Sequence, residues 1–460
     1  MYFKQFYLGC LAHASYLIGS EGQAAVVDPR RDVDIYLEEA EKEGLKIRYI
    51  IETHLHADFV SGHRELAELT GAEIVFGYRA SPSFPYLAVK EGDKLQVGKI
   101  FLEIYETPGH TPESISVLVT DREDPDAVAK LLTGDTLFIG DVGRPDLVGS
   151  KGYTPETMAG MLYDSLHEKL LKLPDQVEIY PAHGAGSLCG RNISNEKSST
   201  IGHEKLFNYA LQIKSRQEFI RTMTTDLPEA PEYFQRDAEL NRTGPELVSQ
   251  KSLPSALTAQ EVNKLLQQGY TVLDTRSSAS FGTGHIPTSV NIGLVGSFAP
   301  WAGSTLNPNS PIIIITDELQ EVEETVIRLA RVGLENIAGY LDGGMAQWEK
   351  AGLETVKLAQ ITVDELAEKL KENRLLQQID VRTEIEFSAG HIPKAKNIPL
   401  PTLLSRLDEI VKTEPLVINC AGGYRSSLAA SLLLKQGFKE IYNLVGGFSA
   451  WQASGLEVTK

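Results

Sequence analysis

The sequence predicts a chain of three domains that combine helices and strands, of the α/β and α+β classes. Its 460 residues are too many for one hydrophobic core, since a domain holds about 150 residues. In the first 245 residues short β-branched runs alternate with amphipathic stretches, and from about residue 255 the chain repeats itself once. We therefore expect domains at 1–245, 255–355 and 360–460.

The composition limits the classes of partner. The chain is 42% hydrophobic and 23% charged, as globular proteins are. Its 44 basic and 62 acidic residues give a formal net charge of −18, which argues against nucleic acid or an anionic membrane as the main partner. No apolar window of about 18 residues predicts a membrane span. Small anionic substrates stay compatible, because they need only a local cluster of donors.

The cysteines indicate the redox compartment. There are three, Cys10, Cys189 and Cys420, and so small and odd a number suits a reducing compartment better than a disulfide framework. The residues Met1–Phe6 lack the charged-then-apolar layout of a signal peptide. We expect a cytoplasmic protein. A cleaved organelle presequence and a homo-oligomer are both left open.

The first 245 residues predict strands that end at polar residues. We expect four strands and two helices here, the strands at Ala24–Val27, Tyr49–Ile51, Lys130–Thr133 and Glu178–Tyr180, and the helices at Val33–Glu43 and His63–Thr70. A His or Asp residue follows each of these four strands. Such an arrangement is typical of an α/β site that is built on loops.

Six residues are candidate metal ligands. His54, His56 and Asp58 alternate directly after one strand, and they converge only if the chain is extended or tightly looped there. The other three each lie near the end of an apolar run beside a small residue; they are His110, Asp135 and His183. A polar loop with scattered histidines is the alternative explanation, and the number of such sites argues against it.

This set of residues resembles the metallo-β-lactamase superfamily, over residues 1–245. The most similar branches are the glyoxalase-II-like thioesterases and the persulfide dioxygenases, and the resemblance implies an αββα sandwich. Two-zinc hydrolases of this fold usually have His-x-His-x-Asp-His, but here the last position is Phe59. An apolar ring cannot bind a metal, so we expect a mononuclear site.

The resemblance to persulfide dioxygenases implies one Fe(II) per chain, held by His54, His110 and Asp135. Two imidazoles and a carboxylate with open positions opposite suit non-haem Fe(II) and O₂. The other three candidates, His56, Asp58 and His183, would then orient these ligands by hydrogen bonding. The alternative is that they are ligands of zinc.

Several further residues receive an expected role from the same resemblance. Arg144, in a Gly-x-x-Gly-Arg-x-Asp segment, would hold an anionic group of the thiol carrier through its guanidinium; a structural role is the alternative. Asp28 would support the loops of the site. We expect Cys10 to be structural. Cys189, six residues after His183, either faces the site or is a small buried hydrophobe, and we favour the second.

The remainder of the chain consists of two homologous units. Asp-Thr-Arg at 274–276 matches Asp-Val-Arg at 380–382, Gly-His-Ile-Pro at 284–287 matches 390–393, and Asn291 matches Asn397, all at an offset of 106. Gly343-Gly344 and Trp348 match Gly446-Gly447 and Trp451 at an offset of 103. Each unit opens with a Thr-x-x-Glu helix start, at Thr258 and Thr362. The alternation of strands and helices predicts parallel sheets with helices on both faces.

Cys420 lies where a nucleophile is expected. A buried strand at Leu416–Asn419 precedes it, a glycine-containing loop follows, and Ser427–Lys435 is predicted to be a helix. Loop amides and the helix dipole stabilise a thiolate there, and Arg425 adds positive charge. The loop resembles the active-site loop of rhodaneses, over residues 360–460. The resemblance implies that Cys420 carries sulfur and that the loop binds substrate, through Gly422, Gly423, Tyr424 and Ser426. His391 is expected to be structural.

The first repeat departs from this pattern. Aligning Trp348 with Trp451 places Asp317 opposite Cys420. The loop at 317–323 has no nucleophile and no glycine, and its four acidic residues would repel an anionic sulfur substrate. We therefore expect residues 255–355 to form a rhodanese-like domain with a packing role and without sulfur transfer.

These observations predict an iron persulfide dioxygenase coupled to a thiosulfate sulfurtransferase. Its partners would be a low-molecular-weight thiol persulfide, O₂, sulfite and thiosulfate. The first alternative is a two-zinc hydroxyacyl-thiol hydrolase of the glyoxalase II type that carries a rhodanese domain. The second is a non-catalytic sulfur-carrier scaffold.

Overall fold

A computed structural model describes residues 1–460 except 125–126, 148–151, 228, 249–252 and 373–375. The chain forms two compact units, of which the first is Met1–Ser252 with Leu329–Gly333 and the second is Leu253–Arg328 with Leu334–Lys460. The boundary that we expected around 244–254 includes 249–252, which lie outside the described residues.

The first unit contains two six-stranded sheets. In the first sheet the strands lie in the order of the sequence, as β1 (Tyr2–Leu8), β2 (His13–Ser20), β3 (Gln23–Val27), β4 (Lys46–Ile51), β5 (Glu73–Gly77) and β6 (Leu87–Val89). The second sheet consists of β7 (Lys94–Val97), β8 (Ile100–Glu106), β9 (Ile115–Asp121), β10 (Lys130–Gly134), β11 (Glu178–Pro181) and β12 (Ser199–Thr200). From β3 to β6, and between β10 and β11, the strands pair in parallel.

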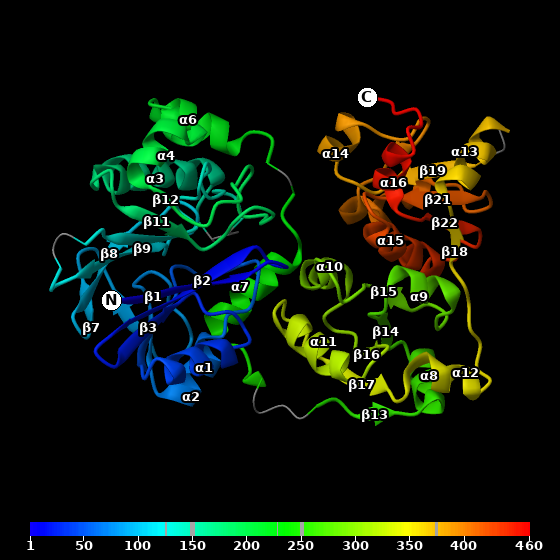
Figure 1. Cartoon of the computed structure of the whole chain (residues 1–460), viewed down its shortest axis with the longest axis horizontal. Helices are drawn as coiled ribbons and strands as arrows, with labels where there is room; N and C mark the ends of the chain where they lie inside the picture. Colours follow the sequence, from blue (N-terminus) through cyan, green and yellow to red (C-terminus); the bar gives the residue numbers. More distant parts are fainter. Residues whose placement is uncertain (125–126, 148–151, 228, 249–252, 373–375) are drawn as a thin grey trace. The chain divides into compact units, whose positions relative to one another are not determined.

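Helices cover the outer faces of both sheets (Figure 1). Alternate residues of a strand point to opposite faces, so Val26 packs against Tyr36 and Leu66 of the helices, while Val27 joins the core between the sheets. The first sheet carries α1 (Asp34–Lys42) and α2 (His63–Thr70). The helices that follow β10 are α3 (Pro155–Glu168), η1 (Leu170–Lys172), α4 (Ile201–Phe207), α5 (Tyr209–Gln212), α6 (Arg216–Thr224) and α7 (Tyr233–Thr243). The predicted αββα sandwich is confirmed.

The predicted elements of this unit agree with the structure to within a few residues. The helix expected at His63–Thr70 has these same bounds, and the one expected at Val33–Glu43 spans Asp34–Lys42. The four expected strands are present as β3, β4, β10 and β11, each extended by one to three residues.

The second unit contains two parallel five-stranded sheets with the same topology. The middle domain has the strand order β13-β17-β16-β14-β15, and the last domain β18-β22-β21-β19-β20. The elements of the middle domain are β13 (Ala256–Leu257), α8 (Ala259–Gln267), β14 (Thr271–Asp274), α9 (Ser278–Thr283), β15 (Val290–Asn291), α10 (Phe298–Thr305), β16 (Ile312–Ile315), α11 (Gln320–Ala330), β17 (Ile337–Leu341) and α12 (Gly344–Lys350).

The last domain repeats this order of elements, with two short 3₁₀ helices in place of α10. Its elements are β18 (Ala359–Ile361), α13 (Val363–Lys371), β19 (Gln377–Asp380), α14 (Glu384–Ala389), β20 (Lys396–Asn397), η3 (Leu400–Thr402), η4 (Leu404–Glu409), β21 (Leu416–Asn419), α15 (Tyr424–Lys435), β22 (Ile441–Leu444) and α16 (Gly447–Ala453). The strand that precedes Cys420 has the predicted bounds, and the helix after it begins three residues earlier than expected.

The repeated motifs make identical contacts in the two domains. Each Asp-x-Arg pair is a buried ion pair, and its arginine also donates to the carbonyl of the glycine before the repeated histidine, at 2.8 Å. His285 and His391 stack on Phe281 and Phe387. Thr258 and Thr362 form capping boxes at their helices. The histidine of the repeat is therefore part of the packing, as expected.

Among the described residues, no helix combines the length and the apolar character that are needed to cross a membrane.

Candidate metal centre and sulfur-transfer loop

Three loops of the first unit bring the predicted iron ligands together. His54 follows β4, His110 lies between β8 and β9, and Asp135 follows β10. One ligand atom from each lies within 4.8 Å of the others, and all three side chains are buried. Oδ2 of Asp135 lies 3.8 Å from Nε2 of His54 and 3.5 Å from Nε2 of His110. The structure thus brings these three residues together, and their role as iron ligands stays a prediction.

Hydrogen bonds orient the two imidazoles. The Thr53 hydroxyl donates to Asp28 at 2.9 Å and lies 3.0 Å from Nδ1 of His54, so it accepts from that nitrogen. Nδ1 of His110 lies 2.9 Å from the Arg144 carbonyl, which can only accept. Both rings therefore carry their proton on Nδ1 and present the lone pair of Nε2 to Asp135.

The donor set fits a metal ion. Within the described part of the chain, Nε2 of His54 and Oδ2 of Asp135 are buried and have no hydrogen-bond partner. Burial lowers the pKa of His54 and of His110, so both are neutral, which is the form that binds a metal. A buried carboxylate oxygen and a buried imidazole nitrogen without partners are costly unless a cation binds beside them.

His183 contacts the oxygen of Asp135 that does not face His54 and His110. Its Nδ1 lies 2.7 Å from Oδ1 of Asp135, and its Nε2 lies 2.8 Å from Oδ2 of Asp58. Although burial alone would lower it, these two carboxylates raise the pKa of His183 to about 10. The protonated ring holds the Asp135 carboxylate with its other oxygen directed toward His54 and His110.

His56 is held in a similar way by two other carboxylates. Its Nε2 lies 3.2 Å from Asp28 and 3.4 Å from Glu52. Burial opposes the charged form, but these carboxylates raise the pKa of His56 well above its usual value. Ligand atoms of His56, Asp58 and His183 also lie within 4.8 Å of one another, so the residues of the zinc alternative are present together as well.

His13, at the start of β2, is a residue of this region that the sequence analysis missed. Its side chain is buried, and neither ring nitrogen has a hydrogen-bond partner among the described residues. Its ring centroid lies 4.2 Å from that of Phe59 and 5.5 Å from that of His183. No local motif marks this histidine, because it reaches the site through the pairing of β2 with the loop after β11.

Arg144 lies beside the metal ligands but is paired internally. Its guanidinium donates to both carboxylate oxygens of Asp146, at 3.1 and 2.8 Å, and to the Leu188 carbonyl at 3.2 Å. The side chain is 2% exposed. A substrate anion would therefore share the guanidinium with Asp146, and the substrate-binding role of Arg144 stays a prediction. Cys189 is buried, which raises the pKa of its thiol well above the usual value, and Cys10 is partly exposed.

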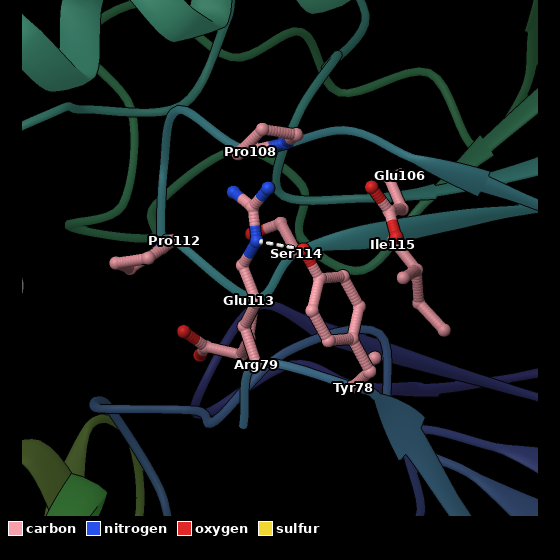
Figure 2. A pocket seen from close by; sticks show the side chains of 9 residues that line it. Tyr78, Arg79, Glu106, Pro108, Pro112, Glu113, Ser114 and Ile115 are labelled. Atoms are coloured by element: carbon pink, nitrogen blue, oxygen red, sulfur yellow. Dashed lines mark hydrogen bonds between the residues drawn. The ribbon is translucent and has the colours of Figure 1, made fainter. Parts of the chain in front are cut away.

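A small pocket lies on the loop that carries His110 (Figure 2). Its wall includes Pro108 and Pro112, which flank that histidine, together with the residues that follow β5. Figure 2 shows the Arg79 side chain beside the Tyr78 ring, whose hydroxyl lies 2.7 Å from Nε of Arg79. The buried Glu113 carboxylate accepts a hydrogen bond from the Leu55 amide at 3.1 Å, which joins this loop to the one that carries His54.

Cys420 lies at the end of β21, inside the loop that opens α15. Its side chain is 1% exposed, the Gly423 amide donates to its Sγ at 3.1 Å, and the Ser426 hydroxyl lies 3.4 Å from Sγ. Gly447 must lack a side chain, because a Cβ there would lie 2.3 Å from the Cys420 carbonyl oxygen. Two predicted loop residues, Gly423 and Ser426, thus contact the sulfur directly.

The predicted charge partner of Cys420 is itself paired. Arg425 donates to both oxygens of Glu386, at 2.8 and 2.7 Å. Glu386 also completes the capping box of α14 with Thr383. The bidentate pair fixes the guanidinium near the loop and offsets part of its charge.

In the corresponding loop of the middle domain, a glutamate side chain accepts hydrogen bonds from the loop amides. The Glu321 carboxylate accepts from the amides of Asp317 and Glu318, at 3.1 and 3.2 Å. In the last domain, an amide of this loop points at Cys420 instead. Because these amides already donate to a carboxylate, they do not offer their N–H groups to a sulfur anion. This agrees with the expectation that the domain does not transfer sulfur.

Comparisons with known proteins agree with this architecture. Residues 8–183 match the family described as "Metallo-beta-lactamase superfamily", and residues 258–351 and 362–454 each match "Rhodanese-like domain". The crystal structure of a metallo-beta-lactamase from Staphylococcus aureus subsp. aureus COL is similar, with 36% identity and a TM-score of 0.67 over 74% of this chain and 98% of that one.

Two curated relatives resemble the first domain. "Persulfide dioxygenase ETHE1, mitochondrial" of Mus musculus is 33% identical over 217 residues, which are 45% of this chain and 75% of the relative. "Hydroxyacylglutathione hydrolase" of Polaromonas sp. (strain JS666 / ATCC BAA-500) is 28% identical over 247 residues, 47% of this chain and 89% of the relative.

The chain therefore belongs to the metallo-β-lactamase superfamily, in a form in which two rhodanese-like domains follow the metal-binding domain. Its first domain is homologous to persulfide dioxygenases, and the expected fusion of such a domain with two rhodanese-like domains is confirmed.

Proposed function

We propose that this chain oxidises a low-molecular-weight thiol persulfide and converts the sulfite into thiosulfate. In the first reaction, persulfide, O₂ and water give thiol and sulfite. The observation that carries this proposal is the buried set of His54, His110 and Asp135 with two partnerless ligand atoms, in the same chain as the Cys420 loop. A relative named persulfide dioxygenase supports the same reading.

The metal that we propose is one Fe(II) per chain. Two neutral imidazoles and one carboxylate are the donors that suit it, and an ion with open positions there would bind and activate O₂. His183 keeps the Asp135 carboxylate turned toward the two imidazoles. Arg144, beside His110, is the residue that we propose for an anionic group of the thiol carrier.

The second reaction belongs to Cys420. Its thiolate attacks the outer sulfur of a persulfide, the S–S bond of that persulfide breaks, and the free thiol leaves. Sulfite then attacks the outer sulfur of the Cys420 persulfide, which releases thiosulfate and restores the thiolate. Loop amides such as that of Gly423 stabilise the thiolate. Tethering the two sites raises the local concentration of sulfite. A reducing compartment, which we propose is the cytoplasm, suits both sites.

An oxygen electrode tests the first reaction directly. Protein purified without air is given persulfides of glutathione, coenzyme A and bacillithiol, and O₂ uptake, sulfite and metal content are measured. We expect about one iron per chain and one O₂ consumed per sulfite formed. Absence of O₂ uptake with every persulfide in an iron-loaded sample contradicts the proposal and supports a non-catalytic scaffold.

A two-zinc thioesterase is the second candidate. The convergence of His56, Asp58 and His183 favours it, as does the similarity to a hydroxyacylglutathione hydrolase. Two zinc ions per chain together with hydrolysis of an acyl-glutathione thioester would establish this candidate in place of the dioxygenase.

A further inference from the structure

One face of α15 carries three polar side chains that bond to the middle domain, and one of them, Ser431, also donates to the Leu428 carbonyl of its own helix at 2.7 Å. Tyr424, Ser427 and Ser431 follow one another at intervals of three and four residues, so they lie on the same side of the helix. Both serines are buried. This face packs against β15 of the middle domain, within the same compact unit (Figure 1).

Two residues of the middle domain partner this face. The Tyr424 hydroxyl donates to the Gly293 carbonyl at 2.8 Å. The Ser427 hydroxyl donates to Oδ1 of Asn291 at 2.6 Å, and the backbone N–H of Asn291 donates to the Ser431 hydroxyl at 3.0 Å. Three hydrogen bonds therefore join residues 424–431 of α15 to a domain that lacks the nucleophile.

The Tyr424 ring also packs closely on a glycine of the middle domain. A Cβ at Gly293 would lie 3.3 Å from Cε2 of Tyr424 and 3.4 Å from the Arg276 carbonyl oxygen. The distance to the ring is shorter than most Cβ contacts, so a side chain at residue 293 would displace the ring by a few tenths of an ångström.

Comparison of the two repeats shows that Asn291 makes the bond to Ser427 in addition to the contacts that its counterpart makes. Asn397, the counterpart of Asn291, donates to two carbonyls of its own domain, at 2.9 Å each, and Asn291 makes the same pair at 3.0 Å. The counterparts of Tyr424, Ser427 and Ser431 on α11 are Glu321, Glu324 and Arg328, at the offset of 103. These side chains have no hydroxyl groups, so they cannot make the contacts that α15 makes. The middle domain therefore supports α15 of the last domain, and among the described residues the last domain gives α11 no equivalent support.

The bonded face adjoins the residues that hold the sulfur. Tyr424 directly follows Gly423, whose amide donates to Sγ of Cys420, and Ser427 directly follows Ser426. Fixing Tyr424 and Ser427 therefore fixes the start of α15, from which the loop amides point at the sulfur.

We propose that the middle domain is a positioning element of the sulfur-transfer site, acting through the contact of Gly293 with Tyr424 and of Asn291 with Ser427. The inference rests on the proposed sulfurtransferase function. It gives the domain without a nucleophile a part in the reaction: it holds the thiolate cradle of its neighbour in shape. Tyr424 and Ser427 are positioning residues in this proposal.

The test uses Tyr424→Phe and Gly293→Ala in the full chain, singly and together. The first removes the hydroxyl and keeps the ring, and the second places a methyl group against the ring. Sulfur transfer from thiosulfate to cyanide is measured, together with the pH profile of alkylation of Cys420 by iodoacetamide. Tyr442→Phe is the matched control, because its hydroxyl bonds to Glu440 within the last domain, at 3.1 Å.

We expect each single variant to lower kcat/KM of sulfur transfer about fivefold, as for one lost hydrogen bond. We also expect the alkylation profile to move to higher pH, since a displaced loop stabilises the thiolate less. The double variant should lose little more than the worse single one, because both act on one contact. The control and the O₂ uptake of all variants should stay unchanged, which also shows that the chains are folded.

The proposal is wrong if both single variants keep kcat/KM and the alkylation profile within twofold of the unchanged chain. It is also wrong if their losses multiply, since independent effects do not pass through one contact. If the unchanged chain transfers no sulfur, the proposed function fails. Alkylation of Cys420 needs no turnover and still decides the positioning role.

Discussion

His183 bridges two carboxylates, with Nδ1 2.7 Å from Oδ1 of Asp135 and Nε2 2.8 Å from Oδ2 of Asp58. The ring is fully buried, and its raised pKa of about 10 means that it carries a positive charge between two negative ones. This positive charge offsets part of the negative charge of Asp58 and Asp135. The hydrogen bond to Oδ1 of Asp135 leaves Oδ2 of that carboxylate for the metal.

Replacing His183 should weaken metal binding without removing a ligand. For His183→Gln we expect metal affinity to fall about 10- to 100-fold, as for other groups that orient a ligand. Competition with a chelator, followed by metal analysis, measures this. His203→Gln, at an exposed position of α4, is the control. If the unchanged chain holds two ions and the variant loses one of them completely, His183 is itself a ligand.

Replacing Phe59 should change the number of metal ions. Phe59 is fully buried, with its ring centroid 4.5 Å from that of His56. Phe59→His completes the motif that the resemblance assigns to two-zinc hydrolases, so we expect a second ion per chain when the variant is loaded with zinc. Metal analysis and thioester hydrolysis report this. An unchanged metal content would mean that a residue other than Phe59 limits the site to one ion.

Cys420→Ser should separate the two reactions. A serine hydroxyl does not become a persulfide, so thiosulfate formation should stop, while O₂ uptake with persulfide continues at its normal rate and sulfite accumulates. Ion chromatography of the products, run beside an oxygen electrode, measures both. Cys10→Ser, in the other compact unit, is the control. Loss of both activities in the Cys420 variant would show that the two sites are not separable.

The Arg425–Glu386 pair should contribute to stability in a defined range of pH. Its hydrogen bonds to Arg425 lower the pKa of Glu386 from 4.5 to about 2. A carboxyl whose pKa is lower in the folded state adds stability above its unfolded pKa, and loses this contribution as the pH falls from about 4.5 toward 2.

Denaturant unfolding at several pH values, compared with Glu386→Gln, measures the contribution of this pair. We expect a constant difference between pH 5.5 and 8, on the order of the fraction of 1 kcal/mol that partly exposed pairs give. The difference should shrink below about pH 4.5. A difference that grew as the pH fell would contradict the pairing.

Much of the fold was predictable because local pattern determines it. Short apolar and β-branched runs located β3, β4, β10 and β11, and the bounds of α2 and β21 were predicted without error. The repeat was visible because each domain needs the same buried Asp-x-Arg pair and the same stacked histidine. His110 and Asp135 were recognisable as candidates because each follows an apolar run beside a glycine, and the resemblance assigned them to iron together with His54.

Other features depend on partners that are distant in the sequence. His13 meets Phe59 and His183 only after the sheets pack, and no spacing indicates it. Arg425 was predicted to add charge beside Cys420, but whether its charge is offset depended on Glu386, 39 residues earlier.

The sequence by itself determined that the middle domain has Asp317 where its neighbour has Cys420, since aligned repeats reveal a missing nucleophile. Only the tertiary structure decided that Gly293 and Asn291 of this domain contact Tyr424 and Ser427. The physical reason is that periodicity shows which face of a helix can be buried, whereas the hydrogen-bond partners of a buried face are determined by packing between domains.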